Sequence, residues 1–140
     1  MIDRTKLAKY IQDLEGYLKH LAELQKHPIE EFLSDWKIYD LAERQLHLAL
    51  ETSLTIGEMI ISEFGFAKPD TYADIPRILF ENKVIPNQLK DKLVDLARFR
   101  NVLVHDYLRL DHERVFQHLQ TDDKTIREFI EAIKKFVAMK

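Results

Sequence analysis

Apolar residues recur at intervals of three and four along most of the chain, which is the spacing of one face of an α-helix. The first stripe predicts a long helix that ends before Pro28, because proline disfavours helical backbone in the residue preceding it. A broader apolar pattern over residues 36–64 predicts a central helix that is contacted on several sides, with Gly65 as its C-terminal stop. Residues 29–34 are either a short separate turn of helix or an early part of this element. The positions of the first stripe are Leu7, Tyr10, Ile11, Leu14, Tyr17, Leu18, Leu21 and Leu24.

The second half of the chain begins with the main predicted loop, "FGFAKPDTYAD", and then returns to helical spacing. Asp74, Asp111 and Asp122 each precede an apolar stripe, and aspartate is a preferred N-cap residue. Pro86 suits the first turn of a helix, where its missing N–H costs nothing. The predicted helices of this half span residues 74–82, 87–104, 112–119 and 123–138.

The chain as a whole contains no repeat, low-complexity tract or linker, so residues 1–140 are expected to form one domain. The fold class that follows is all-α, a single-domain antiparallel bundle of about five to six helices. Several helices are apolar around more than a third of their circumference. That breadth fits either a well-filled monomer core or a homodimer interface, and composition leaves both open.

Composition narrows the function classes. The 140 residues contain no cysteine, which excludes a disulfide framework, a thiolate zinc site and a cysteine nucleophile, and fits a reducing, cytoplasmic location. No apolar run approaches the roughly 18 residues of a membrane span, and the N-terminus lacks the apolar core of a signal peptide. A net charge of −3 argues against a protein that coats nucleic acid generally, but it permits a local basic cleft. The histidines lack a helical zinc-site pattern, and there is no Gly-rich phosphate loop or GxSxG, so neither metal nor cofactor is expected.

The stretch "ARFRNVLVHDYLRLD" places polar residues where burial is expected. Arg100 falls in line with a row of leucines, and Asn101 falls in the neighbouring apolar row. Burying an unpaired charge costs several kcal/mol, so Arg100 needs either a carboxylate partner or an anion from outside. His105 lies about 140° from Arg100 around an ideal helix, whereas Tyr107 returns to the side of Arg100. Either the helix unwinds near Val104, or a second copy of the helix completes the site.

Two interpretations of this stretch remain open from the residues alone. In the structural one, Arg100 pairs with a buried carboxylate such as Glu43 or Glu58, and His105 caps the helix C-terminus. In the functional one, Arg100 binds phosphate oxygens with two donors at once and His105 exchanges a proton near neutral pH. Glu43 and Arg44 either support the motif arginine or extend the phosphate-binding surface, or else they form salt-bridged helix surface.

The order of the elements and the motif "RNVLVHDY" resemble the HEPN superfamily, and specifically its HepT-like toxin branch with the spacing Arg-x4-His-x-Tyr. The resemblance covers essentially the whole chain. It runs from the opening amphipathic helix through "LAERQLHLALETSLTIGEMII", "DIPRILFENKVIP" and the motif helix to "LDHERVFQHLQ" and a final helix. It implies a helical domain that dimerises and brings two motif helices together around one cleft, which would answer the 140° offset.

The resemblance implies a metal-independent endoribonuclease toxin. Arg100 would bind and polarise the scissile phosphate, and His105 would take the proton of the ribose 2′-OH or give one to the leaving oxygen. Asn101 would orient the motif or touch the phosphate. Arg98 and Arg109 flank the motif and could contact the RNA backbone, although neighbouring acidic residues dilute that patch.

The same branch pairs the toxin with a minimal nucleotidyltransferase (MNT) antitoxin that transfers AMP to the tyrosine of the motif. Here that residue would be Tyr107, and the added phosphates would place negative charge beside Arg100 and repel RNA. The simpler interpretation of Tyr107 is a buried aromatic residue at a helix end. The alternative function is a non-catalytic nucleotide-binding module or scaffold for the nucleotidyltransferase.

Overall fold

The computed structural model describes residues 3–105 and 110–140, and all secondary structure in these ranges is helical. This confirms the prediction of an all-α bundle of five to six helices. The short segment 29–34 is a helix of its own, separated from the next one by Asp35, which caps it by accepting from the Lys37 N–H. The helices are α1 (Arg4–Leu24), α2 (Ile29–Ser34), α3 (Trp36–Glu63), α4 (Asp74–Glu81), α5 (Asn87–His105) and α6 (His112–Ala138).

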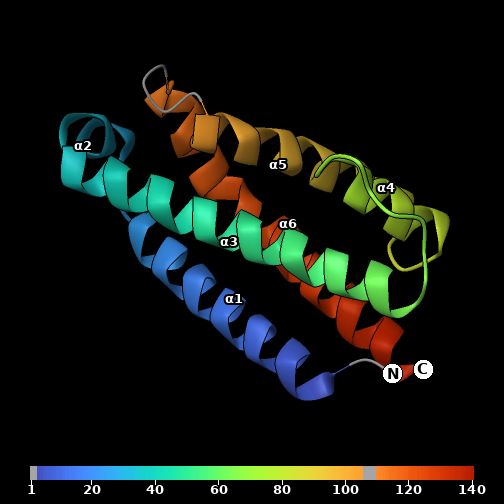
Figure 1. The fold of residues 1–140 in the computed structure, drawn as a ribbon. Coiled ribbons are helices and arrows are strands. Elements are labelled where there is room, and N and C mark those ends of the chain that lie inside the picture. Colours follow the sequence, from blue (N-terminus) through green and yellow to red (C-terminus); the bar gives the residue numbers. More distant parts are fainter. Residues whose placement is uncertain (1–2, 106–109) are drawn as a thin grey trace.

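Helix α3 lies at the centre of the bundle and contacts each of the other five described helices. Figure 1 shows α1 along one side of α3, α5 and α4 along the other, and α6 crossing behind. Eleven residues of α3 are buried, and they are spread around the helix as its broad apolar pattern predicts. The prediction of a central helix touched on several sides is therefore confirmed, and α3 is the element against which the motif helix α5 is placed.

The C-terminal end of α3 is set by Gly65, as predicted. Gly65 has φ of 68°, and the N–H of Phe66 donates to the carbonyl of Ile61 at 3.0 Å, which is the Schellman arrangement. Farther back on α3, Gly57 lets α4 approach closely. A Cβ added there would lie 2.6 Å from Cγ2 of Ile75, so only a glycine fits without a shift.

The prediction of two closing helices, at residues 112–119 and 123–138, is wrong. One continuous helix, α6, replaces the two predicted helices, and Asp122 lies inside it rather than capping a second helix. Asp122 is only 3% exposed, and its carboxylate meets the ring of His118 one turn earlier. Because buried Leu119 and Ile126 flank this turn, core packing carries the helix through a segment whose local residues favour a cap. Asp111 does cap α6, accepting from the N–H groups of Glu113 and Arg114.

The core is one contiguous cluster of buried side chains drawn from all six helices. The first and last helices are also linked by a hydrogen bond, because the guanidinium of Arg4 donates to the carbonyl of Val137 at 3.3 Å. Among the helices of the described ranges, none is both long and apolar enough to cross a membrane.

Candidate active site

Arg100 is the centre of the site. Its residue is 9% exposed, and its Nε donates to Oε2 of Glu51 on α3 at 2.6 Å. Nη1 donates to Oδ1 of Asn101 at 3.1 Å, and the ring of Tyr72, from the α3–α4 loop, lies 4.4 Å from Cζ. These contacts fix the plane of the guanidinium but use only part of its N–H donors. Asn101 itself is exposed, so the burial predicted for it from its apolar row is wrong.

The carboxylate partner of Arg100 differs from the two that sequence suggested. Glu43 and Glu58 were the expected candidates, but the ion pair is made by Glu51. Glu58 is exposed, and Glu43 lies two helical turns before Glu51, where it meets another residue. Tertiary packing decides which turn of α3 faces Arg100, because the apolar pattern alone does not fix the sliding of α5 along α3.

Glu43 supports the start of α6 instead. One of its carboxylate oxygens lies 3.1 Å from Nδ1 of His112, and the His112 ring packs on Tyr39 with centroids 4.0 Å apart. Burial raises the pKa of the Glu43 carboxyl, and the nearby Asp40 adds to the rise, while His112 opposes it. This contact joins α3 to the start of α6, so Glu43 meets His112 rather than Arg100.

His47 also belongs to the site, although the sequence pattern did not distinguish it from the other histidines. Its Nε2 lies 3.6 Å from Oε2 of Glu51, the same oxygen that accepts from Arg100. Burial lowers the pKa of His47, while Glu51 raises it and the positive charges of Arg100 and Arg44 lower it further. The signal that could have found it is the four-residue spacing of His47 and Glu51 in "HLALE", which places both on one side of α3.

Arg44 and Arg98 lie outside the contacts of Arg100. Arg44 is exposed on α3, one turn before His47, and contributes positive charge there. Arg98 is exposed on α5, about 200° around the helix from Arg100. Its guanidinium lies 3.9 Å from Asp95 on its own helix. The two arginines therefore mark separate surfaces of the bundle.

His105 is the last residue of α5 and is exposed. Helix α5 continues unbroken to His105, so the chain does not unwind near Val104, and the angular offset between Arg100 and His105 persists. Of the two ways to bring these side chains together, the structure removes the one within a single helix. Tyr107 and Arg109 lie outside the described residues.

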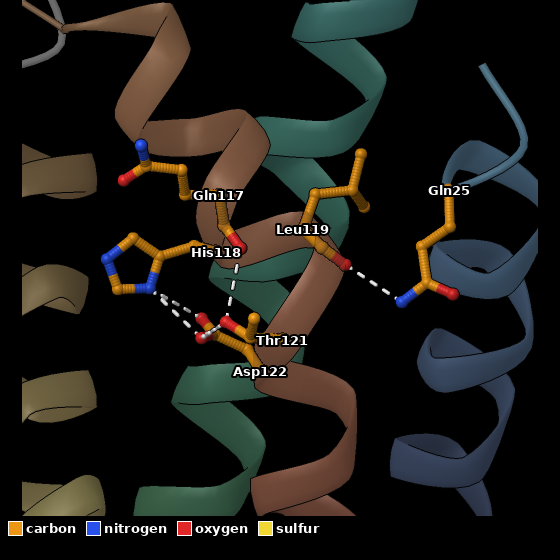
Figure 2. Close-up of polar contacts among 6 residues, drawn as sticks. All are labelled: Gln25, Gln117, His118, Leu119, Thr121 and Asp122. Atoms are coloured by element: carbon orange, nitrogen blue, oxygen red, sulfur yellow. Dashed lines mark hydrogen bonds and ion pairs between the residues drawn. The ribbon is translucent and has the colours of Figure 1, made fainter. Parts of the chain in front are cut away.

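A polar pair on α6, formed by partly exposed His118 and buried Asp122, packs against the motif helix. Nδ1 of His118 lies 2.9 and 3.0 Å from the two carboxylate oxygens of Asp122, as Figure 2 shows. The His118 ring stacks flat on Phe99, the residue before Arg100, with centroids 3.6 Å apart and planes 5° from parallel. Burial raises the pKa of the Asp122 carboxyl, and His118 opposes the rise. Because Phe99 is fully buried and precedes Arg100, this stacking packs α6 against the motif helix next to Arg100.

No group of three or more His, Cys, Asp or Glu side chains in the described part of the chain is arranged to hold a metal ion. The site is thus built from Arg100, Asn101, Glu51, His47 and Tyr72, with His105 at the end of the same helix. Such a set can bind an oxyanion and exchange protons.

Comparison with known proteins shows which family the chain resembles. The family described as "Ribonuclease HepT-like" matches residues 7–133. The chain is 27% identical to an mRNA nuclease HepT of Shewanella oneidensis over 74% of this chain and 78% of that protein. It is 26% identical to a tRNA nuclease HepT of Aphanizomenon flos-aquae over 71% and 68% of the two chains.

Solved structures agree with the fold. The cytosolic protein YutE of Bacillus subtilis superposes with a TM-score of 0.85 at 25% identity, covering 99% of this chain and 92% of that one. A tri-AMPylated HEPN toxin of Shewanella oneidensis, in complex with an MNT antitoxin, superposes with a TM-score of 0.86 at 24% identity, covering 96% and 99%. With a match over almost the whole chain and the motif on the expected helix, this protein belongs to the ribonuclease HepT-like family.

Proposed function

We propose that this protein is an endoribonuclease toxin of a toxin–antitoxin pair and that it cleaves RNA without a metal ion. The observation that carries the proposal is the buried guanidinium of Arg100. It is oriented by Glu51 and Asn101 within an Arg-Asn-x-x-x-His motif. The relatives named as mRNA and tRNA nucleases support RNA as the substrate class.

The chemistry needs no protein nucleophile, because the ribose 2′-OH beside the scissile phosphate is itself the nucleophile. Arg100 binds the phosphate through its remaining N–H donors and offsets the charge that develops on the oxygens. His105 moves a proton at the attacking or leaving oxygen, and the product end is a 2′,3′-cyclic phosphate. Asn101 holds Arg100 in place. Arg44 and Arg109 supply positive charge to neighbouring stretches of the RNA backbone, whereas Arg98 lies on another surface of the bundle.

The active unit in this proposal is a homodimer. Arg100 and His105 diverge by about 140° on an unbroken helix, so one chain does not direct both at the same phosphate. Two copies of α5 that face each other across a two-fold axis would let Arg100 of one chain and His105 of the other act on the same phosphate.

Regulation would come from an MNT-type nucleotidyltransferase antitoxin that adds AMP to Tyr107. Support comes from the Shewanella toxin, which is tri-AMPylated and bound to such a partner. In this chain Tyr107 stands two residues after His105, so added phosphates would compete with RNA for Arg100. Mass spectrometry after incubation with the nucleotidyltransferase and ATP should show gains in steps of one AMP. A gain on Tyr107→Phe would remove the switch from this residue.

The central test is cleavage of RNA by the purified protein in EDTA, followed by sequencing of the product ends. Arg100→Ala and His105→Ala should each abolish cleavage while keeping the helical circular-dichroism signal. Arg77→Ala is the matched control, because Arg77 is an exposed arginine on α4 that pairs with Asp74. Unchanged cleavage in both site variants would reject the site, and no cleavage by the wild type would reject the function.

One observation favours a second candidate, a non-catalytic nucleotide-binding module or scaffold for the nucleotidyltransferase. Arg100 already has a carboxylate partner in Glu51, so its burial does not by itself demand an anion from outside. That candidate predicts AMP transfer to the protein but no RNA cleavage by the protein after removal of AMP.

A further inference from the structure

The proposed reaction requires two proton transfers, and the motif offers one histidine. Attack forms a bond between the 2′ oxygen and phosphorus and breaks the bond between phosphorus and the 5′ oxygen. A base must accept the 2′-OH proton while an acid protonates the 5′ oxygen as it leaves. His105 can perform one of these transfers, so a second group is needed at the phosphate that Arg100 holds.

Helix α3 places a histidine beside that arginine. Arg100 Nε and His47 Nε2 lie 2.6 and 3.6 Å from the same oxygen of Glu51, so the two nitrogens are separated by no more than the sum of these distances. Glu51 accepts from Nε of Arg100, which leaves other N–H groups of the guanidinium for a phosphate. The His47 side chain is 30% exposed, so RNA can reach it.

We propose that His47 is a catalytic residue of this site, accepting the 2′-OH proton, while His105 protonates the leaving 5′ oxygen. This assignment rests on the proposed ribonuclease function. The proton leaves the 2′ oxygen for the imidazole of His47 as the 2′-oxygen–phosphorus bond forms. A second proton passes from the imidazolium of His105 to the 5′ oxygen. The two histidines then return to their starting states by exchange with water, so no co-reactant is needed.

The surroundings of His47 suit a base. The charged groups that act on it are Arg44 and Glu51 on its own helix and Arg100 on α5. Burial and the two arginines keep the ring neutral at the pH where an ordinary histidine begins to protonate, although Glu51 acts in the opposite direction. A neutral imidazole can accept a proton at once, whereas an imidazolium cannot.

His47 is the one histidine on α3, and apart from His105 the other histidines of the described residues have partners elsewhere. His112 and His118 meet Glu43 and Asp122. His27 pairs with Glu31, and His20 meets Gln45 at 2.8 Å. His20 is exposed on α1, on the other side of α3 from α5, and therefore offers a matched control.

The experiment compares wild type, His47→Gln and His20→Gln in single-turnover cleavage of an RNA oligonucleotide in EDTA, from about pH 4.5 to 8.5. In parallel, fluorescence anisotropy measures binding of the same oligonucleotide with a 2′-deoxy sugar at every position, which cannot be cleaved. His47→Gln should lower the cleavage rate about 10²–10⁴-fold, the range for loss of a general acid or base. Its affinity for the 2′-deoxy probe should stay unchanged, and its rate should lose the acidic limb of the pH profile. Imidazole added to His47→Ala should restore part of the rate, which a purely structural histidine would not allow.

The outcomes separate the two proposals. If wild type and His47→Gln cleave equally with the same acidic limb, while Arg100→Ala is inactive, the inference is wrong and the ribonuclease stands. A loss of rate matched by an equal loss of probe binding, without imidazole rescue, also overturns it. If the wild type does not cleave, the proposed function has failed and the inference fails with it. If His47→Gln loses its helical signal, the test is whether added imidazole restores cleavage by His47→Ala. Restored cleavage supports the inference, and no restoration overturns it.

Discussion

The two partners of the Arg100–Glu51 ion pair differ in exposure, so their removal should change the free energy of unfolding by different amounts. The Arg100 residue is 9% exposed, the Glu51 side chain is 38% exposed, and their atoms approach to 2.6 Å. Removing one partner of a fully buried pair costs about 3–5 kcal/mol, whereas an exposed pair is worth about 0–1 kcal/mol. Because Arg100 is buried and Glu51 is partly exposed, we expect an intermediate cost. Glu51→Gln should lower the free energy of unfolding by about 2 kcal/mol, or the Tm by roughly 5–10 °C.

Replacing the arginine should have the opposite sign. Arg100→Met removes the buried charge and puts an apolar chain of similar length into the row of Leu96 and Leu103. It should therefore be neutral or stabilising by about 1 kcal/mol while it abolishes RNA cleavage. In the Arg100→Met background, Glu51→Gln should cost almost nothing, so the double-mutant cycle should give a coupling energy of about 2 kcal/mol.

The assay is urea unfolding followed by circular dichroism, with the four proteins of the cycle at one pH. Asp95→Asn is the control, because Asp95 lies 3.9 Å from Arg98 on the same helix with both side chains exposed. It should change stability by less than about 0.5 kcal/mol. Equal costs of Glu51→Gln in both backgrounds would refute the reasoning, since the loss would then not come from a charge left unpaired.

The remaining predictions concern packing and pH and use the same unfolding assay. Gly57→Ala should destabilise by about 1–3 kcal/mol, because its Cβ would meet Ile75 at 2.6 Å, and a smaller effect would show that α4 shifts freely. Gly16→Ala, with no atom within 4 Å of the added Cβ, should stabilise α1 by about 0.5–1 kcal/mol. Burial raises the pKa of Asp122, so its contribution to stability is complete below its ordinary value near 4 and is lost as pH rises through the raised value. Asp122→Asn stays neutral at every pH, so the stability of the variant relative to the wild type should rise as the pH increases from about 4 through the raised pKa of Asp122. A constant difference would contradict the role of burial.

Much of the fold was predictable because helical periodicity is a local property. The stripe that ends before Pro28, the long central helix and its stop at Gly65 were read correctly from spacing and end signals. The error at Asp122 has a clear cause. Aspartate favours N-caps because its carboxylate can accept hydrogen bonds from nearby backbone N–H groups. Here the Asp122 carboxylate is buried inside the helix and meets the ring of His118 instead.

For the candidate site, the sequence determined that Arg100 lies in an apolar row and that His105 diverges from it around the helix. Both conclusions need only the geometry of one helix. It also required a partner for the buried charge, without determining which. Only the tertiary structure decided that Glu51, rather than Glu43 or Glu58, meets the guanidinium and that His47 lies beside it. The physical reason is that the sliding and rotation of α5 on α3 follow from the packing of the whole core, and no local pattern along either helix encodes them.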